Sequence, residues 1–220
     1  MEVDPCEVVG GNLAFIPQLY DRWERSLVQK LLPPNGTFVD VGSNIGAYAL
    51  WAASCLDKAG RVIALEADPD NYALLMRNVK INGQQGLVTC VLGGIADEDQ
   101  VLRFYKNTNG NRGGHSFVGT GDQFIEVKCR PLLDVLQANK VVQVDFMKLD
   151  IEGFEEKVLS RFFESTVKSS PLRPTYLLVE IQGGPVADPA TQARIKKMIC
   201  GHGYELTVDK DNSFFKKLPV

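Results

Sequence analysis

The sequence alternates between short apolar runs rich in β-branched residues and longer segments whose apolar residues recur every three or four positions. The runs predict strands at Thr37–Val41, Arg61–Leu65, Leu87–Leu92, Val144–Leu149 and Thr175–Glu180. The segments between them predict helices at Ile45–Leu56, Pro69–Ile81, Pro131–Ala138 and Phe154–Phe163. Such alternation is typical of parallel strands covered by helices, and the continuous apolarity of the runs indicates strands buried on both faces.

The last part of the chain departs from this rhythm. Tyr204–Val208 and Ser213–Lys217 flank the polar turn DKDN and predict an antiparallel hairpin. A mostly parallel α/β sheet of seven strands, closed by such a hairpin and covered by helices on both faces, is the Rossmann-like class I methyltransferase arrangement. With 220 residues, 45% of them hydrophobic, we expect one domain. Residues 1–33 would form an N-terminal cap segment and 34–220 the core.

A glycine-rich loop, Asn107–Gly121, interrupts the core between two further strand-like runs, Val101–Tyr105 and Ile125–Cys129. It is the centre of an insertion near 106–124, and its length makes it a candidate binding loop. We expect it to order over the site when an acceptor binds. His115 within it is either a base with a pKa near neutrality or a loop histidine exposed to solvent.

Charge and cysteine usage narrow the class of protein. The net charge of −3 argues against nucleic acid as the main partner, because phosphate binding needs a concentrated basic face. The five cysteines are far apart and form no framework, which indicates reduced thiols. No signal pattern and no run of about 18 apolar residues is present, so we expect a soluble, cytoplasmic protein without a membrane span.

The segment Phe38–Tyr48, FVDVGSNIGAY, predicts a buried strand, a tight turn and a helix. Gly42 permits the turn and close approach of a ligand, and Gly46 lets the helix pack near the strand. The spacing D-x-G-x-x-x-G differs from the glycine pattern of nicotinamide enzymes. Asp40 would repel a pyrophosphate but suits the ammonium group of S-adenosylmethionine. The alternative is a turn that binds no ligand.

Glu66 ends the next predicted strand, where a carboxylate binds the ribose hydroxyls of an adenosine, unless it only ends the strand in solvent. After the third strand, Ile95 and Ala96 are candidates for the face of the adenine ring. Asp97 is a candidate for its amino group, although it suits a turn equally well. The other predicted cofactor contacts are Ser43, Asn44 and Ala67.

At these residues the chain resembles the FkbM-type methyltransferases, over roughly Trp23 to Ile181. The likeness includes FVDVGSNIGAYAL, VIALEADPDNYALLMRNVKIN, GIADED, LLDVL and above all FMKLDIEGFEEKVL, which matches the family's lysine-aspartate-x-glutamate-glycine signature. The resemblance implies a class I fold, S-adenosylmethionine as methyl donor and usually O-methylation of natural products, sugars or lipid-linked glycans. The expected acceptor is therefore a small molecule or glycan.

Three other functions stay open. They are a small-molecule N-methyltransferase, a nicotinamide oxidoreductase and a non-catalytic adenosine-binding module. Asp40 and the missing middle glycine argue against the oxidoreductase. The absence of an NPPY- or DPPY-type segment argues against methylation of nucleic-acid bases.

Candidate catalytic residues gather where the fourth and fifth predicted strands end. Lys148 and Asp150 are two positions apart and so share a face, Glu152 follows in a turn, and Glu180 ends the next strand. In one hypothesis Asp150, Glu180 and Gln182 hold a magnesium ion, which prefers oxygen ligands. In the other, which we favour, Asp150 or Glu152 takes the acceptor's proton without a metal. Lys148 either takes part or only neutralises the acids.

Overall fold

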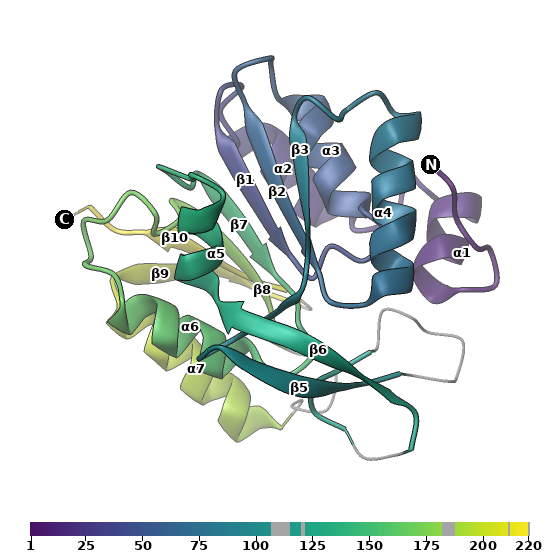
Figure 1. Cartoon of the computed structure of the whole chain (residues 1–220). Helices are drawn as coiled ribbons and strands as arrows, with labels where there is room; N and C mark the ends of the chain where they lie inside the picture. Colours follow the sequence, from purple (N-terminus) through teal and green to yellow (C-terminus); the bar gives the residue numbers. More distant parts are fainter. Residues whose placement is uncertain (107–114, 120–121, 182–187, 211, 220) are drawn as a thin grey trace.

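The computed structural model describes residues 1–106, 115–119, 122–181, 188–210 and 212–219. Its main sheet has seven strands in the order β3-β2-β1-β7-β8-β10-β9 (Figure 1). The strands are β1 Thr37–Val41, β2 Arg61–Glu66, β3 Val88–Leu92, β7 Phe146–Leu149, β8 Tyr176–Glu180, β9 Tyr204–Asp209 and β10 Asn212–Lys217. The first five run parallel, and β10 is antiparallel to both β8 and β9. The predicted class I fold with a closing hairpin is confirmed.

Helices cover both faces of this sheet (Figure 1). One face carries α2 Arg22–Leu31, α3 Ala47–Cys55 and α4 Pro69–Ile81, and the other carries α5 Leu132–Ala138, α6 Glu155–Glu164 and α7 Pro189–Gly201. Successive strand residues alternate between the two cores. Phe38 and Phe146 pack with α3, whereas Val39 and Met147 pack with α5 and α6. This explains the continuous apolarity of the strands.

A second sheet of three strands is inserted between β3 and α5. It consists of β4 Gly94–Ala96, β6 Phe124–Pro131 and β5 Gln100–Tyr105, in that spatial order, with β5 and β6 antiparallel. Figure 1 places β5 and β6 beyond the carboxyl ends of β1 and β2. Of the predicted binding loop, 107–114 and 120–121 lie outside the described residues, so its ordering on binding stays a prediction.

The ends of several elements follow local signals. Asp68 accepts hydrogen bonds from Asp70 N and Asn71 N and caps the start of α4, as predicted. The helix ends at Ile81, and Asn82 is its C-cap. The predicted start of α3 at Ile45 is wrong by two residues, because Gly46 has a φ of +93° and cannot belong to the helix. The strand predicted from Val144 begins at Phe146, because the Val144 amide binds outside the sheet, to Pro171 O.

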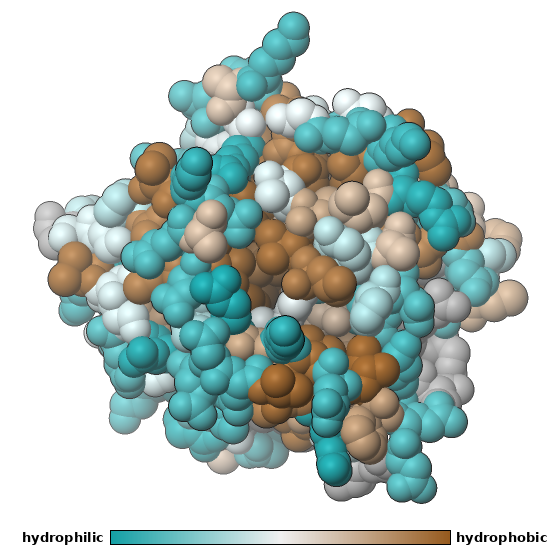
Figure 2. Space-filling view, in the orientation of Figure 1, coloured by the Kyte–Doolittle hydropathy of each residue, from teal (hydrophilic) through white to brown (hydrophobic). Residues whose placement is uncertain are grey.

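The sequence interpretation omitted β4, α2, α7 and α1 Val8–Phe15, which lies beside α4 (Figure 1). Helix α7 begins with the same signal as α4, since Asp188 caps Ala190 N and Thr191 N ahead of Pro189. Figure 2 shows apolar residues near the centre of one face of the molecule and polar residues around them. In the ranges given above, no helix combines the length and apolarity that crossing a membrane requires.

Candidate active site

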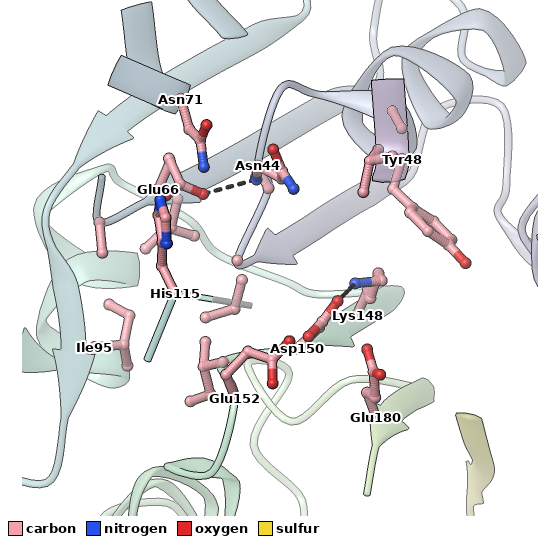
Figure 3. A pocket seen from close by; sticks show the side chains of 18 of the residues that line it. Asn44, Tyr48, Glu66, Asn71, Ile95, His115, Lys148, Asp150, Glu152 and Glu180 are labelled. Carbon is pink, nitrogen blue, oxygen red and sulfur yellow. Dashed lines mark hydrogen bonds and ion pairs between the residues drawn. The ribbon is translucent and has the colours of Figure 1, made fainter. Parts of the chain in front are cut away.

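A cavity of about 320 Å³ opens at the carboxyl ends of β1, β2, β7 and β8, where α/β sheets of this kind bind ligands (Figure 3). Most of the predicted site residues line it, namely Gly42, Ser43, Asn44, Glu66, Ala67, Ile95, His115, Lys148, Asp150, Glu152 and Glu180. Four others do not line it, namely Asp40, Gly46, Ala96 and Asp97. Gln182 lies outside the described residues.

The turn after β1 forms the floor of the cavity. Gly42 has a φ of +83°, and a Cβ there would lie 1.8 Å from the backbone oxygen of Asp150. Only glycine therefore allows this turn to lie so close to the chain leaving β7. A Cβ at Gly46 would lie 2.7 Å from a methyl group of Leu75 in α4, so Gly46 serves helix packing.

Glu66 holds the same turn from the end of β2. Its side chain is 6% exposed, and its two oxygens accept hydrogen bonds from Asn44 N at 2.7 Å and Asp68 N at 2.8 Å. Burial raises the pKa of Glu66 to about 7, although these two amides oppose the shift. Each carboxylate oxygen can accept a second hydrogen bond, so the group can still bind a ligand that donates.

Asp40 lies beneath the cavity and not on its wall. It is 1% exposed, and on parallel strands it is the register partner of Lys148. Burial raises the pKa of Asp40 to about 6, and the nearby Lys148 ammonium opposes this shift. Neither carboxylate oxygen has a hydrogen-bond partner within the described ranges. Of the residues that line the cavity, Lys148 is therefore the one to which Asp40 is electrostatically coupled most strongly.

Lys148 and Asp150 form an ion pair at the opposite end of the cavity from Glu66, with 2.7 Å between Nζ and Oδ2. Asp150 stands one residue beyond β7, so the two side chains are close although only Lys148 belongs to the strand. The Lys148 ammonium also lies 4.8 Å from the centre of the Tyr48 ring. Burial disfavours its charge, but Asp150 and Asp40 together raise the pKa of Lys148 above its ordinary value.

Glu152 and Glu180 point toward this ion pair (Figure 3). Burial, followed by the nearby Asp150 charge, raises the pKa of Glu152 to about 7 and that of Glu180 to about 9. Glu152 has a φ of +52°, and its backbone oxygen accepts a hydrogen bond from Ser116 Oγ at 2.5 Å. The three acids predicted to converge therefore do so, and two of them bind protons near neutrality.

His115 is 8% exposed, so it is not the solvent-exposed loop residue of the alternative hypothesis. Its Nε2 lies 4.0 Å from an oxygen of Asp68, and its ring meets that of Phe104 edge-on, with 6.0 Å between the ring centres. Figure 3 shows it beside Glu66, across the cavity from Asp150. Its role as a base stays a hypothesis.

For a metal ion, the described ranges hold no group of three or more His, Cys, Asp or Glu side chains arranged to bind one. The ligand set Asp150, Glu180 and Gln182 therefore stays a hypothesis.

Asp97, the residue predicted to contact the adenine amino group, lies off the cavity and accepts a hydrogen bond from Gln100 Nε2 at 3.3 Å.

The sequence interpretation missed part of the wall, namely Tyr20, Asp21, Glu24, Tyr48, Asn71, Phe117 and Asn212. Tyr48 donates a hydrogen bond to Asp21 at 2.9 Å, and Asn212 Nδ2 donates to Glu24 at 3.3 Å. Asn71 follows Asp68 in the first turn of α4 and could have been found from the cap motif. The N-terminal residues carry no local signal, because they reach the site through contacts with distant parts of the chain, as Asp21 does with α3 and Glu24 with β10.

Residues 40–206 match the family model described as the methyltransferase FkbM domain. A curated relative, the ribosomal protein L11 methyltransferase of Pelotomaculum thermopropionicum, is 36% identical over 98 residues, which are 44% of this chain and only 30% of that protein. The crystal structure of an O-methyltransferase from Bacillus cereus in complex with SAH has a TM-score of 0.56, with 17% identity over 100% of this chain and 93% of that one. The structure of methyltransferase FkbM from Methylobacillus flagellatus has a TM-score of 0.54, with 14% identity over 88% and 50% of the two chains.

Proposed function

This chain belongs to the FkbM methyltransferase family, and from that premise we propose that it transfers a methyl group from S-adenosylmethionine to a hydroxyl of a small molecule, a sugar or a natural product. The observation that carries the proposal is that the two ends of this cavity differ chemically. A buried carboxylate, Glu66, lies at one end, and the Lys148–Asp150 ion pair lies at the other. The net charge of −3 supports a small acceptor over a nucleic acid.

The residues at the Glu66 end fit the adenosine part of the donor. Glu66 has acceptor capacity left for the two ribose hydroxyls. Ile95 and Phe117 offer apolar surface for the adenine ring. Gly42 lines the cavity without a side chain, so its backbone can approach the methionine part. Asp40, which does not line the cavity, contributes by favouring the charged form of Lys148.

The residues at the other end fit proton removal from the acceptor. S-adenosylmethionine supplies a methyl group on positively charged sulfur, and a hydroxyl oxygen that accepts it must lose its proton. Asp150 accepts the hydrogen bond of the acceptor hydroxyl and orients it, while Lys148 fixes Asp150. Asp150 or Glu152 then takes the proton, and the Glu152 pKa of about 7 suits a base at neutral pH. This mechanism uses no metal ion.

Calorimetry with S-adenosylhomocysteine, compared with NAD, tests the donor. We expect binding in the micromolar range for the first and none for the second, and tighter binding of NAD would refute the proposal.

Turnover of Asp150→Asn tests the chemistry. We expect activity to be lost while S-adenosylhomocysteine still binds, and a chelator to leave wild-type turnover unchanged. Glu126→Gln, at an exposed position of β6, is the matched control. Full activity of Asp150→Asn would remove Asp150 from the mechanism.

A further inference from the structure

The end of the cavity away from Glu66 is strongly acidic. Its wall holds five carboxylates from three parts of the chain, namely Asp21, Glu24, Asp150, Glu152 and Glu180. Lys148 is the one lysine or arginine among the described residues that line the cavity, and it is paired with Asp150. If all five acids were ionised, their negative charge would far exceed the single positive charge of Lys148 in a partly buried space, which is unfavourable unless protons or a cation offset it.

Glu24 is the most isolated of these acids. Its side chain is 9% exposed, and within the described ranges no lysine, arginine or histidine lies within ion-pair distance of it. Among the described residues its side chain accepts a hydrogen bond from Asn212 Nδ2, at 3.3 Å. A carboxylate so deeply buried would normally have a cationic partner. Glu24 is thus arranged for a positive group that the described residues do not supply.

Asn212 gives an independent indication of the same kind. It is 8% exposed and lines the cavity, and because Nδ2 donates to Glu24, its Oδ1 is left as an acceptor. That oxygen is buried and has no hydrogen-bond partner among the residues that the structure describes. Buried acceptors are rarely left unpaired without a functional reason. Here the missing partner is a hydrogen-bond donor.

Glu180 adds a third acceptor beside Asn212. It is the register partner of Asn212 on the antiparallel strands β8 and β10, and residues paired in this way point to the same side of the sheet. Glu24 reaches the same point from α2 through Asn212. An ammonium group has three N–H donors and one positive charge, which matches this set of acceptors.

The donor's own charges do not account for the whole excess. S-adenosylmethionine brings a sulfonium and an ammonium group but also a carboxylate, so it adds a single net positive charge to a wall with five acids and one lysine. The raised pKa values of Glu152 and Glu180 reduce the excess in the free protein, because both groups hold protons near neutrality. A second cation would let these acids ionise.

We propose that the methyl acceptor carries a protonated amine in addition to its hydroxyl, as an amino sugar or an amino alcohol does, and that Glu24, Asn212 and Glu180 bind this amine. The inference rests on the proposed function, because it concerns the acceptor of that reaction. The acceptor would thus be positively charged. Glu24, Asn212 and Glu180 would bind its amine, whereas Asp150 orients its hydroxyl.

The test uses acceptor-like probes in pairs that differ by one amine, namely glucosamine against glucose and ethanolamine against ethylene glycol. Each is titrated by NMR or calorimetry into the protein loaded with S-adenosylhomocysteine, and again without it. We expect at least one amine to bind about tenfold or more tightly than its neutral partner, as a charge-assisted hydrogen bond provides. Glu24→Gln should abolish this preference and leave the affinity for S-adenosylhomocysteine unchanged. Glu126→Gln, the exposed control, should keep it.

Several results would overturn the inference. They are equal binding of amine and neutral probes, no binding of either, or a loss of S-adenosylhomocysteine affinity in Glu24→Gln, which would assign the acids to the donor. Tight binding of Mg²⁺ alone, in competition with the amines, would assign them to a metal. Glu180→Gln is the second variant should Glu24→Gln not fold. Failure of wild-type protein to bind S-adenosylhomocysteine would count against the proposed function. The titration of the amines without S-adenosylhomocysteine tests the amine site separately.

Discussion

Glu66→Gln tests the cofactor end of the cavity, because it keeps the shape of the side chain and removes one acceptor oxygen. Glu66 accepts hydrogen bonds from Asn44 N at 2.7 Å and Asp68 N at 2.8 Å. Glutamine can satisfy only one of these amides, and the other would face an NH₂ group. An unsatisfied buried donor costs about 1–3 kcal/mol, so the free energy of unfolding should fall by that amount below about pH 6, where Glu66 is mostly protonated and the substitution removes no buried charge.

The same substitution should weaken the binding of S-adenosylhomocysteine. Replacing a charged acceptor of a ribose hydroxyl costs about 1.5–3 kcal/mol, which raises the Kd about ten- to hundredfold. Calorimetry between about pH 5.5 and 8.5 adds a second readout. The Glu66 pKa is about 7 in the free protein, and a ligand that donates hydrogen bonds favours the ionised form. Wild-type affinity should therefore rise as the pH rises toward 7 and then level off.

In Glu66→Gln this part of the pH dependence should disappear, because the amide does not titrate. The control is Glu126→Gln, which removes the same charge from an exposed position of β6. A variant that binds S-adenosylhomocysteine as tightly as wild type, with the same dependence on pH, would show that the ribose does not contact Glu66. The cofactor would then have to bind elsewhere in the cavity.

Three further predictions concern stability. Gly42→Ala should lower the free energy of unfolding by about 3 kcal/mol or more, since its Cβ would lie 1.8 Å from the Asp150 oxygen at a φ of +83°; an unchanged denaturation midpoint would contradict this. Burial raises the pKa of Glu66 to about 7 and of Asp40 to about 6, so the folded protein holds these two protons more tightly than the unfolded chain does. The resulting contribution to the free energy of unfolding is complete below about pH 4 and is lost as the pH rises through 6–7. The melting temperature should fall from pH 5 to pH 8, and a rise would refute the assignment. Arg173→Ala should cost about 3 kcal/mol, because buried Arg173 donates to three backbone oxygens; denaturation at or near the wild-type midpoint would show that these bonds contribute little.

The strands and most helices could be predicted because their signals are local. Apolar runs define β1, β2 and β7, and Asp68 with Pro69 marks the start of α4. The same signal at Asp188 and Pro189 marks α7, so that helix was also readable from the sequence. The position of Asp40 below the cavity follows from strand alternation as well, since it shares a face with Phe38 of the buried core.

At the acceptor end, the residues that follow β7 and β8 could be predicted, but those from α2, α3 and β10 could not. The latter are polar side chains without a motif, and each reaches the cavity only because another part of the chain lies against it. Glu24 meets Asn212 through a contact between α2 and β10, and Tyr48 meets Asp21 across α3 and the N-terminal segment. No periodicity links residues so far apart, so this part of the site depends on the tertiary fold.

The contact between Glu24 and Asn212 also sets the order in which the molecule can be completed on the ribosome. The two residues are 188 positions apart, which corresponds to about 10 to 40 seconds of translation at about 5–20 residues per second. During that interval α2, β1 and β2 can already pack. Strand β8 still lacks one of its neighbours, because β10 lies between it and β9 in the sheet. The Glu66 end of the cavity can thus form early in synthesis. The acidic end, and with it any choice among acceptors, forms only after β10 has left the ribosome.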